Sequence, residues 1–199
     1  MIKIEIATVY LTAMLAVAPK KDPRVRLNGV HLNARDKKLE ATDSRAALII
    51  NYPLPDELEE NVILPVTFVA DCVKAAKLMK QDFVTIAYNP KDGSLEMDLY
   101  KSVVLSGLFP PLERFFPAQY DEPSCFIDIK FINMYHKAMT AISKSQNTPS
   151  VWNPVFGLSN GNSKCAVMQW KDIAFIAMGI NIKEEHIFAT ADVIGCLNR

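Results

Sequence analysis

The sequence predicts an α+β protein in which helices lie on one face of antiparallel sheets. The first observation is the strict alternation of apolar and polar residues in Ile2–Ile6, which is typical of a half-buried strand. The second is the amphipathic spacing of Phe131–Ser143, which is typical of a helix that packs on one side only. The third is that the order of one strand, one helix and then several strands occurs three times along the 199 residues.

The first repeat joins the strand at Ile2–Ile6 to a helix predicted over Thr8–Ala18. Pro19 and Pro23 end this helix, because proline lacks the amide hydrogen that a further helical turn needs. Three predicted strands complete the repeat, at Arg24–Asn33, Lys38–Thr42 and Ala46–Tyr52.

The second repeat begins with a short strand at Val62–Leu64 and continues into a helix predicted over Pro65–Met79. Proline is favourable at a first helical position, where its missing amide hydrogen would have no partner. The turn residues of Asn89–Gly93 reverse the chain between strands. The strands of this repeat are predicted at Phe83–Tyr88, Leu95–Leu99 and Ser102–Leu108.

The third repeat has the same order, with a strand predicted at Phe126–Ile129 and a helix at Phe131–Ser143. Sequence similarity between the three repeats is weak, so the shared order of elements is what relates them. The remaining predicted strands are Val155–Ser159, Lys164–Trp170 and Ile173–Ile180.

Composition limits the possible environments of the chain. Half of the residues are hydrophobic, which is enough for a sizeable core, and the 22 basic and 22 acidic side chains balance. Any attraction to nucleic acid must therefore come from local clustering of charge. The four cysteines form no C-x-x-C pair, and no apolar run approaches the ~20 residues of a membrane span. We expect a cytoplasmic protein with reduced thiols and no membrane partner.

The motifs of common enzyme and metal sites are absent from the sequence. His31, His136 and His186 lie far apart, without the spacing of metal ligands. The sequence contains no G-x-S-x-G elbow, no phosphate-binding loop and no G-x-G-x-x-G run. We therefore expect a protein that is not an enzyme and that uses no metal and no cofactor.

Three segments resemble the bacterial sliding clamp, the beta subunit of DNA polymerase III. Arg24–Leu48, which reads R-V-R-L-N-G-V-H-L-N-A-R-D-K-K-L-E-A-T-D-S-R-A-A-L, is similar to the R-x-x-L-N-G…A-T-D-G run of the clamp's middle domain. Phe109–Pro117 resembles the F-P-D-x-x-x-x-x-P motif that closes this domain, and Phe175–Asn181 resembles the terminal V-x-M-P-M-R strand. The first two segments and the preceding helix are the more specific part of the resemblance.

The resemblance implies the DNA-clamp fold, built from repeated β-α-β-β-β units. Residues 1–118 would form one complete clamp-like domain of two units, and residues 119–199 a partial domain of one unit with a C-terminal tail. The implied function is that of a processivity factor that encircles duplex DNA, docks polymerase or other replication-protein peptides, and is opened by a clamp loader. A chain of this length would need several copies to close a ring, so we expect a homo-oligomer. The chain is short for a sliding clamp, which suggests that a phage or prophage gene encodes it.

The helices carry the residues that the resemblance assigns to DNA. A sliding clamp needs positive charge without base-reading contacts, because attraction to phosphates is independent of sequence. Helical spacing puts the lysines of the second helix on one arc and those of the third on its polar face, and neither face carries a carboxylate. The alternative is an ordinary solvated helix face. The candidate DNA-binding residues are Lys20, Lys21, Arg24, Lys74, Lys77, Lys80, Lys137 and Lys144.

The resemblance also places a peptide-binding pocket between the first repeat and the last strand. This chain departs from the family at Ser44, Arg45, Ala46 and Ala47, where the family has glycine, histidine, arginine and leucine. The departures predict a shallower pocket or one suited to a different peptide, and the alternative is that these are core residues at a domain junction. The candidate pocket residues are Leu27, Thr42, Ser44, Arg45, Pro110, Phe115, Met178 and Ile180.

Two further functions are compatible with the sequence. One is a clamp-fold interaction module that holds a replication-protein peptide without encircling DNA. The other is a structural phage protein that binds neither peptide nor DNA.

Overall fold

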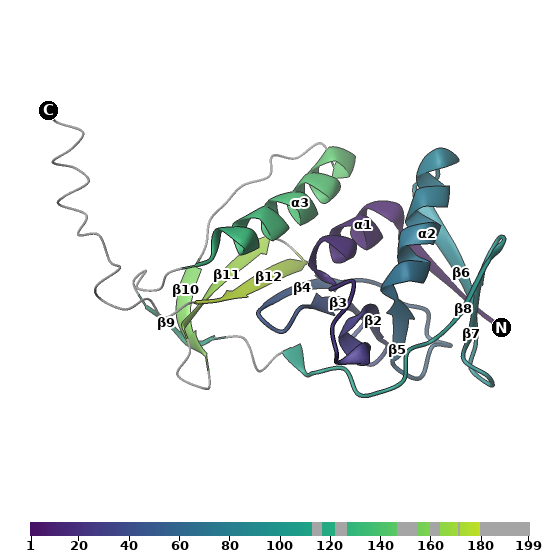
Figure 1. Ribbon diagram of the computed structural model, residues 1–199, viewed down its shortest axis with the longest axis horizontal. Helices are drawn as coiled ribbons and strands as arrows, with labels where there is room; N and C mark the ends of the chain where they lie inside the picture. Colours follow the sequence, from purple (N-terminus) through teal and green to yellow (C-terminus); the bar gives the residue numbers. More distant parts are fainter. Residues whose placement is uncertain (113–116, 122–126, 147–154, 160–163, 171, 180–199) are drawn as a thin grey trace, which may run out of the picture.

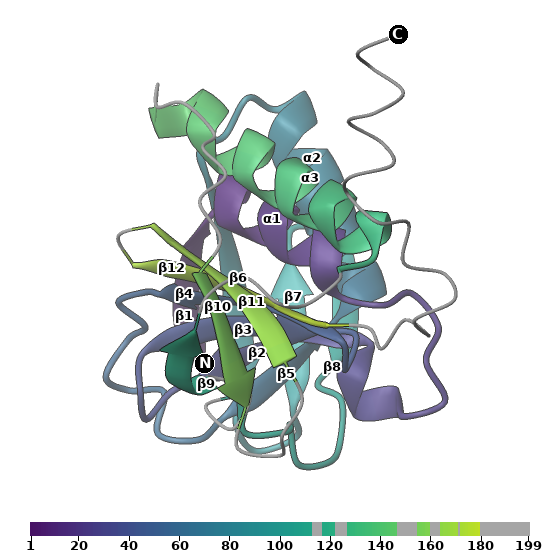
Figure 2. The same ribbon diagram turned by 90° about the vertical axis from the view of Figure 1, so that its left-hand side faces the viewer.

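Three helices form a layer on one side of the molecule, and the strands lie beneath them (Figures 1 and 2). The computed structural model describes residues 1–112, 117–121, 127–146, 155–159, 164–170 and 172–179. The helices are α1 (Thr8–Val17), α2 (Val66–Leu78) and α3 (Ile129–Gln146), and α1 lies in the middle, packed against both others. The predicted arrangement of helices on one face of antiparallel sheets is confirmed.

The strands form two antiparallel sheets. One has four strands in the order β1-β6-β7-β8, and the other has eight in the order β5-β2-β3-β4-β12-β11-β10-β9. The strands are β1 (Ile2–Ala7), β2 (Gly29–Asn33), β3 (Lys38–Thr42), β4 (Ala46–Asn51), β5 (Val62–Pro65), β6 (Phe83–Asn89), β7 (Ser94–Met97), β8 (Tyr100–Val103), β9 (Pro117–Asp121), β10 (Val155–Ser159), β11 (Lys164–Trp170) and β12 (Ile173–Met178).

The first two repeats exchange their first strands. β1 pairs with β6 of the second repeat, where Ile4 lies opposite Ile86. β5 pairs with β2 of the first repeat, where Leu64 lies opposite Val30. Each sheet therefore contains a strand from the other repeat, so neither repeat can complete its sheet alone.

The third repeat joins the first along one continuous sheet. β12 pairs antiparallel with β4, from Ile173 opposite Ile50 to Ala177 opposite Ala46. β11 and β10 follow, and β9 forms the far edge through its pairing with β10. The seam between β4 and β12 is therefore a hydrogen-bonded joint between segments that are far apart in sequence.

The main core lies between the helices and the sheets. Alternate strand residues point into it, including Ile4 and Ile6 of β1, and Phe131 and Phe175 are among its largest fully buried side chains. Each such side chain contributes about 1.5–3 kcal/mol by leaving water. A second apolar cluster on the opposite face of the eight-stranded sheet contains Leu27, Ala47, Ile49, Ile63, Phe109, Leu112, Cys165, Val167 and Ile176.

Several predicted strand boundaries were wrong in the first two repeats. The strand predicted at Arg24–Asn33 begins only at Gly29, because Val25–Leu27 form a 3-10 helix, η1. Pro65 ends β5 and precedes α2, so it is not the first helical residue. The strands predicted at Leu95–Leu99 and Ser102–Leu108 are instead β7 and β8, joined by a turn in which Asp98 has a φ of 51°.

The strand predicted at Phe126–Ile129 was also wrong for its described residues. Ile127 and Asp128 lie outside any strand, and α3 begins at Ile129. The Asp128 carboxylate accepts a hydrogen bond from the Lys130 amide at 2.9 Å, as a helix-capping aspartate does. β9 was not predicted. Phe126, Phe115, Ile180 and the tail from 183 to 199 lie outside the described residues.

No helix in the described segments is long and apolar enough to cross a membrane.

Candidate functional site

A cationic groove crosses the helix layer. Its volume is about 530 Å³, and all three helices contribute to its walls. Lys77 enters it from α2, while His136 and Lys137 enter it from α3. The remaining lining residues are Val9 and Thr12 of α1 and Thr140 and Ala141 of α3. Two lysines that the sequence places on separate helices therefore share one hollow.

The chemistry of this groove suits an anion. No carboxylate is among the lining residues that the structure describes, so Lys77 and Lys137 meet no acid in this part of the groove. The Thr12 hydroxyl donates its proton to the Thr8 carbonyl at 2.8 Å, so the lysines supply the charged donors of the groove. Lysine side chains in such a groove attract phosphates by charge, and this attraction is independent of base sequence.

The other predicted basic residues lie outside the groove lining. Lys74 and Lys80 are exposed on α2 and just beyond its end, where Lys80 has a φ of 54° that terminates the helix. Lys20 and Lys21 are exposed after α1. Lys144 belongs to α3, but its side chain is outside the described part of the chain. Sequence analysis omitted His136 from the candidates, although it lies beside Lys137 on the polar face of α3.

Arg24 holds a loop together and does not line the groove. Its guanidinium binds the Asp22 carboxylate through Nε at 2.9 Å and Nη2 at 2.8 Å, and Nη2 also donates to the Ser44 hydroxyl at 3.0 Å. These hydrogen bonds from the Arg24 side chain, followed by that from its backbone amide, lower the pKa of Asp22 from 3.8 to about 2. Arg24 therefore ties the segment after α1 to the turn between β3 and β4.

The L-N-G run that resembles the clamp family has a structural role at each position. Leu27 is buried in the cluster beneath the eight-stranded sheet. The Asn28 side chain accepts from the Asp22 amide at 2.6 Å and donates to the Asp22 carbonyl at 2.9 Å. A Cβ on Gly29 would lie 2.6 Å from the Leu64 carbonyl oxygen, so only glycine allows β5 to approach β2 this closely.

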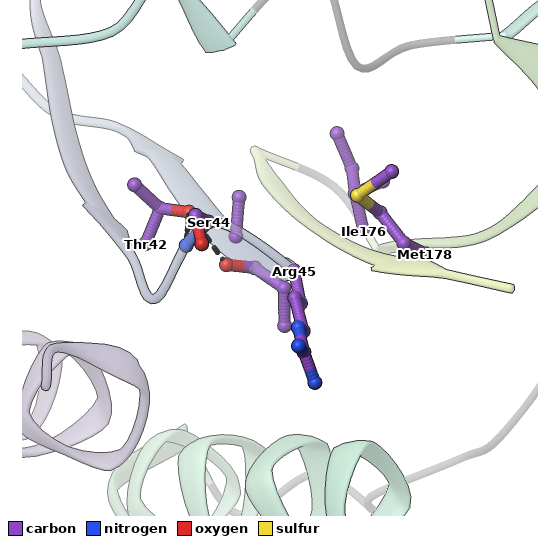
Figure 3. A pocket seen from close by; sticks show the side chains of 7 residues that line it. Thr42, Ser44, Arg45, Ile176 and Met178 are labelled. Carbon is purple, nitrogen blue, oxygen red and sulfur yellow. Dashed lines mark hydrogen bonds between the residues drawn. The ribbon is translucent and has the colours of Figure 1, made fainter. Parts of the chain in front are cut away.

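A second, apolar hollow lies at the end of the seam between β4 and β12 (Figure 3). Its free volume is about 10 Å³, which is close to the space that one water molecule occupies. It is therefore nearly closed in this structure. The lining residues are Thr42, Ser44, Arg45, Ala46, Ala47, Ile176 and Met178.

Hydrogen bonds make the β3–β4 turn at this hollow rigid. The Thr42 hydroxyl donates to the Ala46 carbonyl at 2.7 Å and accepts from the Ser44 amide at 2.9 Å. The Asp43 carboxylate accepts from the amides of Arg45 and Ala46 at 2.9 and 2.7 Å. Ser44 has a φ of 75°, the left-handed conformation for which the family's glycine is suited.

Four of the predicted pocket residues meet at this hollow, namely Thr42, Ser44, Arg45 and Met178. Ile176 and Met178 belong to β12, whereas Arg45 belongs to the β3–β4 turn and its side chain points away from them (Figure 3). Leu27 and Pro110 do not line it. Leu27 lies behind its wall, in the cluster that also contains Ala47 and Ile176. Pro110 is half-buried and follows Phe109 of the same cluster, and Phe115 and Ile180 are not among the described residues.

Metal and thiol chemistry find no support among the described residues. They contain no group of three or more His, Cys, Asp or Glu side chains that could hold a metal ion. The Cys72 thiol is buried, and this desolvation, followed by the nearby charge of Asp71, raises its pKa to about 12. Such a thiol is a poor nucleophile.

Comparison with solved structures identifies the fold. A protein from Eubacterium rectale, assigned as a DNA polymerase III beta subunit, matches 96% of this chain and 67% of its own length, with a TM-score of 0.61 and 10% identity. The DNA polymerase III beta protein of Caulobacter crescentus matches 92% and 66%, with a TM-score of 0.59 and 13% identity. The Helicobacter pylori beta clamp bound to a DNA ligase peptide matches 90% and 65%, with a TM-score of 0.57 and 12% identity. The chain has the sliding-clamp fold.

At these identities the likeness to sliding clamps concerns the fold alone. The chain spans about two thirds of the length of the clamp chains that it matches. No protein-family model and no curated protein sequence matches the chain.

Proposed function

We propose that this chain is a clamp-type DNA polymerase processivity factor whose helix layer faces duplex DNA. The observation that carries the proposal is the groove of about 530 Å³ that Lys77 and Lys137 share across three helices. The chain as a whole has no net charge, yet these two cations lie together on the helix layer. In a sliding clamp this layer borders the channel. The protein binds and slides, and it catalyses no reaction.

Electrostatics favours duplex DNA as the ligand of this groove. DNA carries about one negative charge per 1.7 Å of helix axis, so a groove with two lysines meets several phosphates wherever it rests. Lys74 and Lys80 extend the basic surface along α2. Because lysines attract phosphates and not particular bases, the attraction is similar at every position along the duplex, and the protein can move.

The seam at β4 and β12 is the proposed docking site for a replication-protein peptide. The hollow is small, but Met178 forms part of its wall, and a flexible methionine can move aside at low cost. Apolar side chains Ala46, Ala47 and Ile176 would then receive an apolar anchor residue. The Helicobacter pylori clamp, which shares the fold, was solved with a DNA ligase peptide bound.

The proposed domain organisation follows the exchange of strands. Residues 1–118 would form one complete domain, because they contain the two repeats that exchange strands. Residues 119–199 would form a partial domain that contains the third repeat. A closed ring would then require more than one chain. A clamp loader, which opens such a ring, is a possible partner. The alternative is a peptide-binding module of the same fold that does not encircle DNA.

The DNA-facing role is tested by charge reversal in the groove. The triple variant Lys74→Glu, Lys77→Glu, Lys137→Glu changes three exposed side chains and should leave the fold intact. Its association with duplex DNA should be lost, and the slope of log K against log salt should fall in magnitude by roughly 2 to 3. The matched control reverses three exposed cations outside the helix layer, Lys3→Glu, Arg35→Glu and Lys91→Glu. Equal DNA binding by the two variants would reject the groove as the DNA site.

Encirclement is tested by DNA topology. A ring should remain on nicked circular DNA and leave a linear duplex by sliding off its ends. The interaction module should show no difference between the two DNAs, while still binding a polymerase-derived peptide. Met178→Asp should abolish peptide binding, because it places a carboxylate in the apolar wall, and should leave DNA binding unchanged.

A further inference from the structure

His136 lies in the cationic groove of the helix layer, together with the two lysines proposed to bind DNA. It lines the groove from α3, immediately before Lys137, and Lys77 lines the groove from α2. All three side chains are exposed, so each can reach a ligand that enters the groove. The groove therefore combines two lysines with one imidazole, and imidazole is the side chain that ordinarily changes its charge between pH 5 and 8.

No acid is among the described residues that line the groove with His136. α1, which packs against α3, has one titratable residue, Tyr10, whose ring lies edge-on against Tyr52 and outside the groove lining. β12, beneath α3, has no titratable residue. The positions of α3 one turn before and after His136 are also uncharged, namely Ile132, Asn133, Met139 and Thr140.

The other titratable groups on the helices beside the groove lie outside its lining. Asp71 and Lys74 are exposed elsewhere on α2. At the start of α3, the Lys130 ammonium pairs with the Asp128 carboxylate at 3.5 Å. Tyr135 lies over Phe175 of β12, and the Lys144 side chain is outside the described part of the chain. Among the described lining residues, the only charged neighbours of His136 are thus Lys77 and Lys137.

In such a groove, protonation of the imidazole and binding of a phosphate favour each other. Without a ligand, a proton on the ring adds a third positive charge to two others, and no carboxylate in the described lining offsets it. A phosphate supplies the negative charge and accepts a charge-assisted hydrogen bond from the ring. Coupling of this kind is reciprocal, so a ligand that favours the protonated ring binds more tightly as the pH falls.

We infer that His136 links DNA binding in this groove to the uptake of a proton, so that affinity for duplex DNA rises as the pH falls from 8 to about 6. The ligand group is a backbone phosphate, and the protonated ring is its third cationic donor beside Lys77 and Lys137. The inference rests on the proposed DNA-facing role of the groove, to which it adds a residue and a dependence on pH.

The test is the affinity of the full chain for a short duplex of mixed sequence, measured at pH 8 and at about pH 6. The wild-type protein should bind about fivefold or more tightly at the lower pH. Its slope of log K against log salt should steepen by roughly 0.9, as expected for one more cation on a phosphate.

Two substitutions at His136 separate its charge from other effects of pH. At about pH 6, His136→Gln should bind as weakly as the wild-type protein binds at pH 8, because the glutamine amide takes up no proton. His136→Lys should bind tightly at both pH values, because its charge is constant over this range. The matched control is Thr85→His, which adds an exposed histidine on β6 and should keep the wild-type pH dependence.

Calorimetry in buffers of different ionisation enthalpy measures the proton directly. DNA binding by the wild-type protein should take up protons, approaching one per groove, and His136→Gln should take up none. Thermal unfolding at both pH values verifies that each variant is folded.

An equal wild-type affinity at the two pH values would overturn the inference and leave the groove as the DNA site. A pH dependence or a proton uptake that His136→Gln retains would overturn it in the same way. Absence of salt-dependent DNA binding by the wild-type protein at both pH values would reject the DNA-facing role itself and this inference with it, since the lysines alone should attract DNA at pH 8. The two failures are therefore distinguishable.

Discussion

The first and third repeats contain the same kinds of element, but they complete their sheets in different ways. In the first repeat the strand before the helix, β1, crosses to the sheet of the second repeat and pairs with β6. In the third repeat the strand that precedes the helix, β9, stays in its own repeat and pairs with β10. β9 thus supplies the edge of β10 from within the third repeat, whereas β2 and β6 each receive a strand from another repeat, and in both arrangements the backbone groups of the strand find partners.

The third repeat is held by other means. Its sheet continues that of the first repeat across the seam, and α3 packs against α1 within the helix layer (Figure 2). Phe175 of β12 sits where these contacts meet, with its ring 5.6 Å from that of Tyr135 on α3. The stability of the third repeat should therefore depend on the seam more than on any contact of its own.

The largest expected effect tests this dependence at Phe175, which is fully buried. Phe175→Ala should lower the free energy of unfolding by about 3–5 kcal/mol, through lost burial and the cavity left behind. Urea denaturation measures the total loss. Hydrogen exchange should show the amides of β11 and β12 exposed before those of β6.

The matched control for this variant is Phe83→Ala, at a phenylalanine of β6 that is 48% exposed. It should change stability by about 0.5 kcal/mol or less. A uniform rise in exchange across β6 and β12 in Phe175→Ala would mean that the repeats unfold as one unit. That result would remove the distinction between them.

A smaller effect is expected where the first and second repeats exchange strands. In Gly29→Ala the new Cβ would lie 2.6 Å from both the Leu64 carbonyl oxygen and the Ile63 Cγ2. We expect a loss of about 1–3 kcal/mol, because β5 must shift away from β2. Thermal unfolding measures this loss, and Thr85→Ala on the exposed face of β6 is the control, with a change within about 0.5 kcal/mol. A stable Gly29→Ala variant would show that the approach of β5 is not tight.

The smallest effect concerns the loop that Arg24 ties to the β3–β4 turn. The pKa of Asp22 is lowered from 3.8 to about 2, chiefly by the Arg24 side chain. A folded-state pKa below the unfolded value means that this contact stabilises the fold above pH 3.8. The stabilisation is lost as the pH falls through about 2.

NMR titration of the Asp22 carboxyl group should give a midpoint near pH 2. Arg24→Gln should raise that midpoint toward 3.8, and Arg35→Gln should leave it unchanged. A midpoint of 3.8 in the wild-type protein would show that the loop is not held by this contact in solution.

Much of the fold could be predicted from local patterns. Lys38–Thr42 was predicted with its observed bounds, because it alternates between two strong turn signals, and α1 ended one residue earlier than expected. η1 was missed because its conformation depends on the contacts of Arg24 and Asn28 with residues elsewhere in the chain. The strand before α3 was predicted at Phe126–Ile129 and not at β9, because alternation reports a suitable sequence and not which segment meets a sheet edge.

The candidate sites also divide into properties that local sequence predicted and properties that depend on tertiary contacts. Helical spacing predicted that Lys77 and Lys137 would each lie on a polar face, but not that the two faces would border one groove with α1 as part of its lining. The resemblance to the clamp family named Leu27 and Pro110 as pocket residues. In the structure Leu27 is buried in the apolar cluster behind the wall of the hollow. Pro110 follows Phe109, which belongs to the same cluster.

The sequence by itself determined the three helices and most of the strands, which helix faces are basic, and which residues allow tight turns. These properties depend on neighbours within a few positions, so periodicity and residue type are enough to predict them. Only the tertiary structure decided that β1 and β5 change sheets and that β4 meets β12. Such pairings join residues tens to more than a hundred positions apart, and they depend on which sheet edges and apolar faces remain to be covered after the local elements have formed.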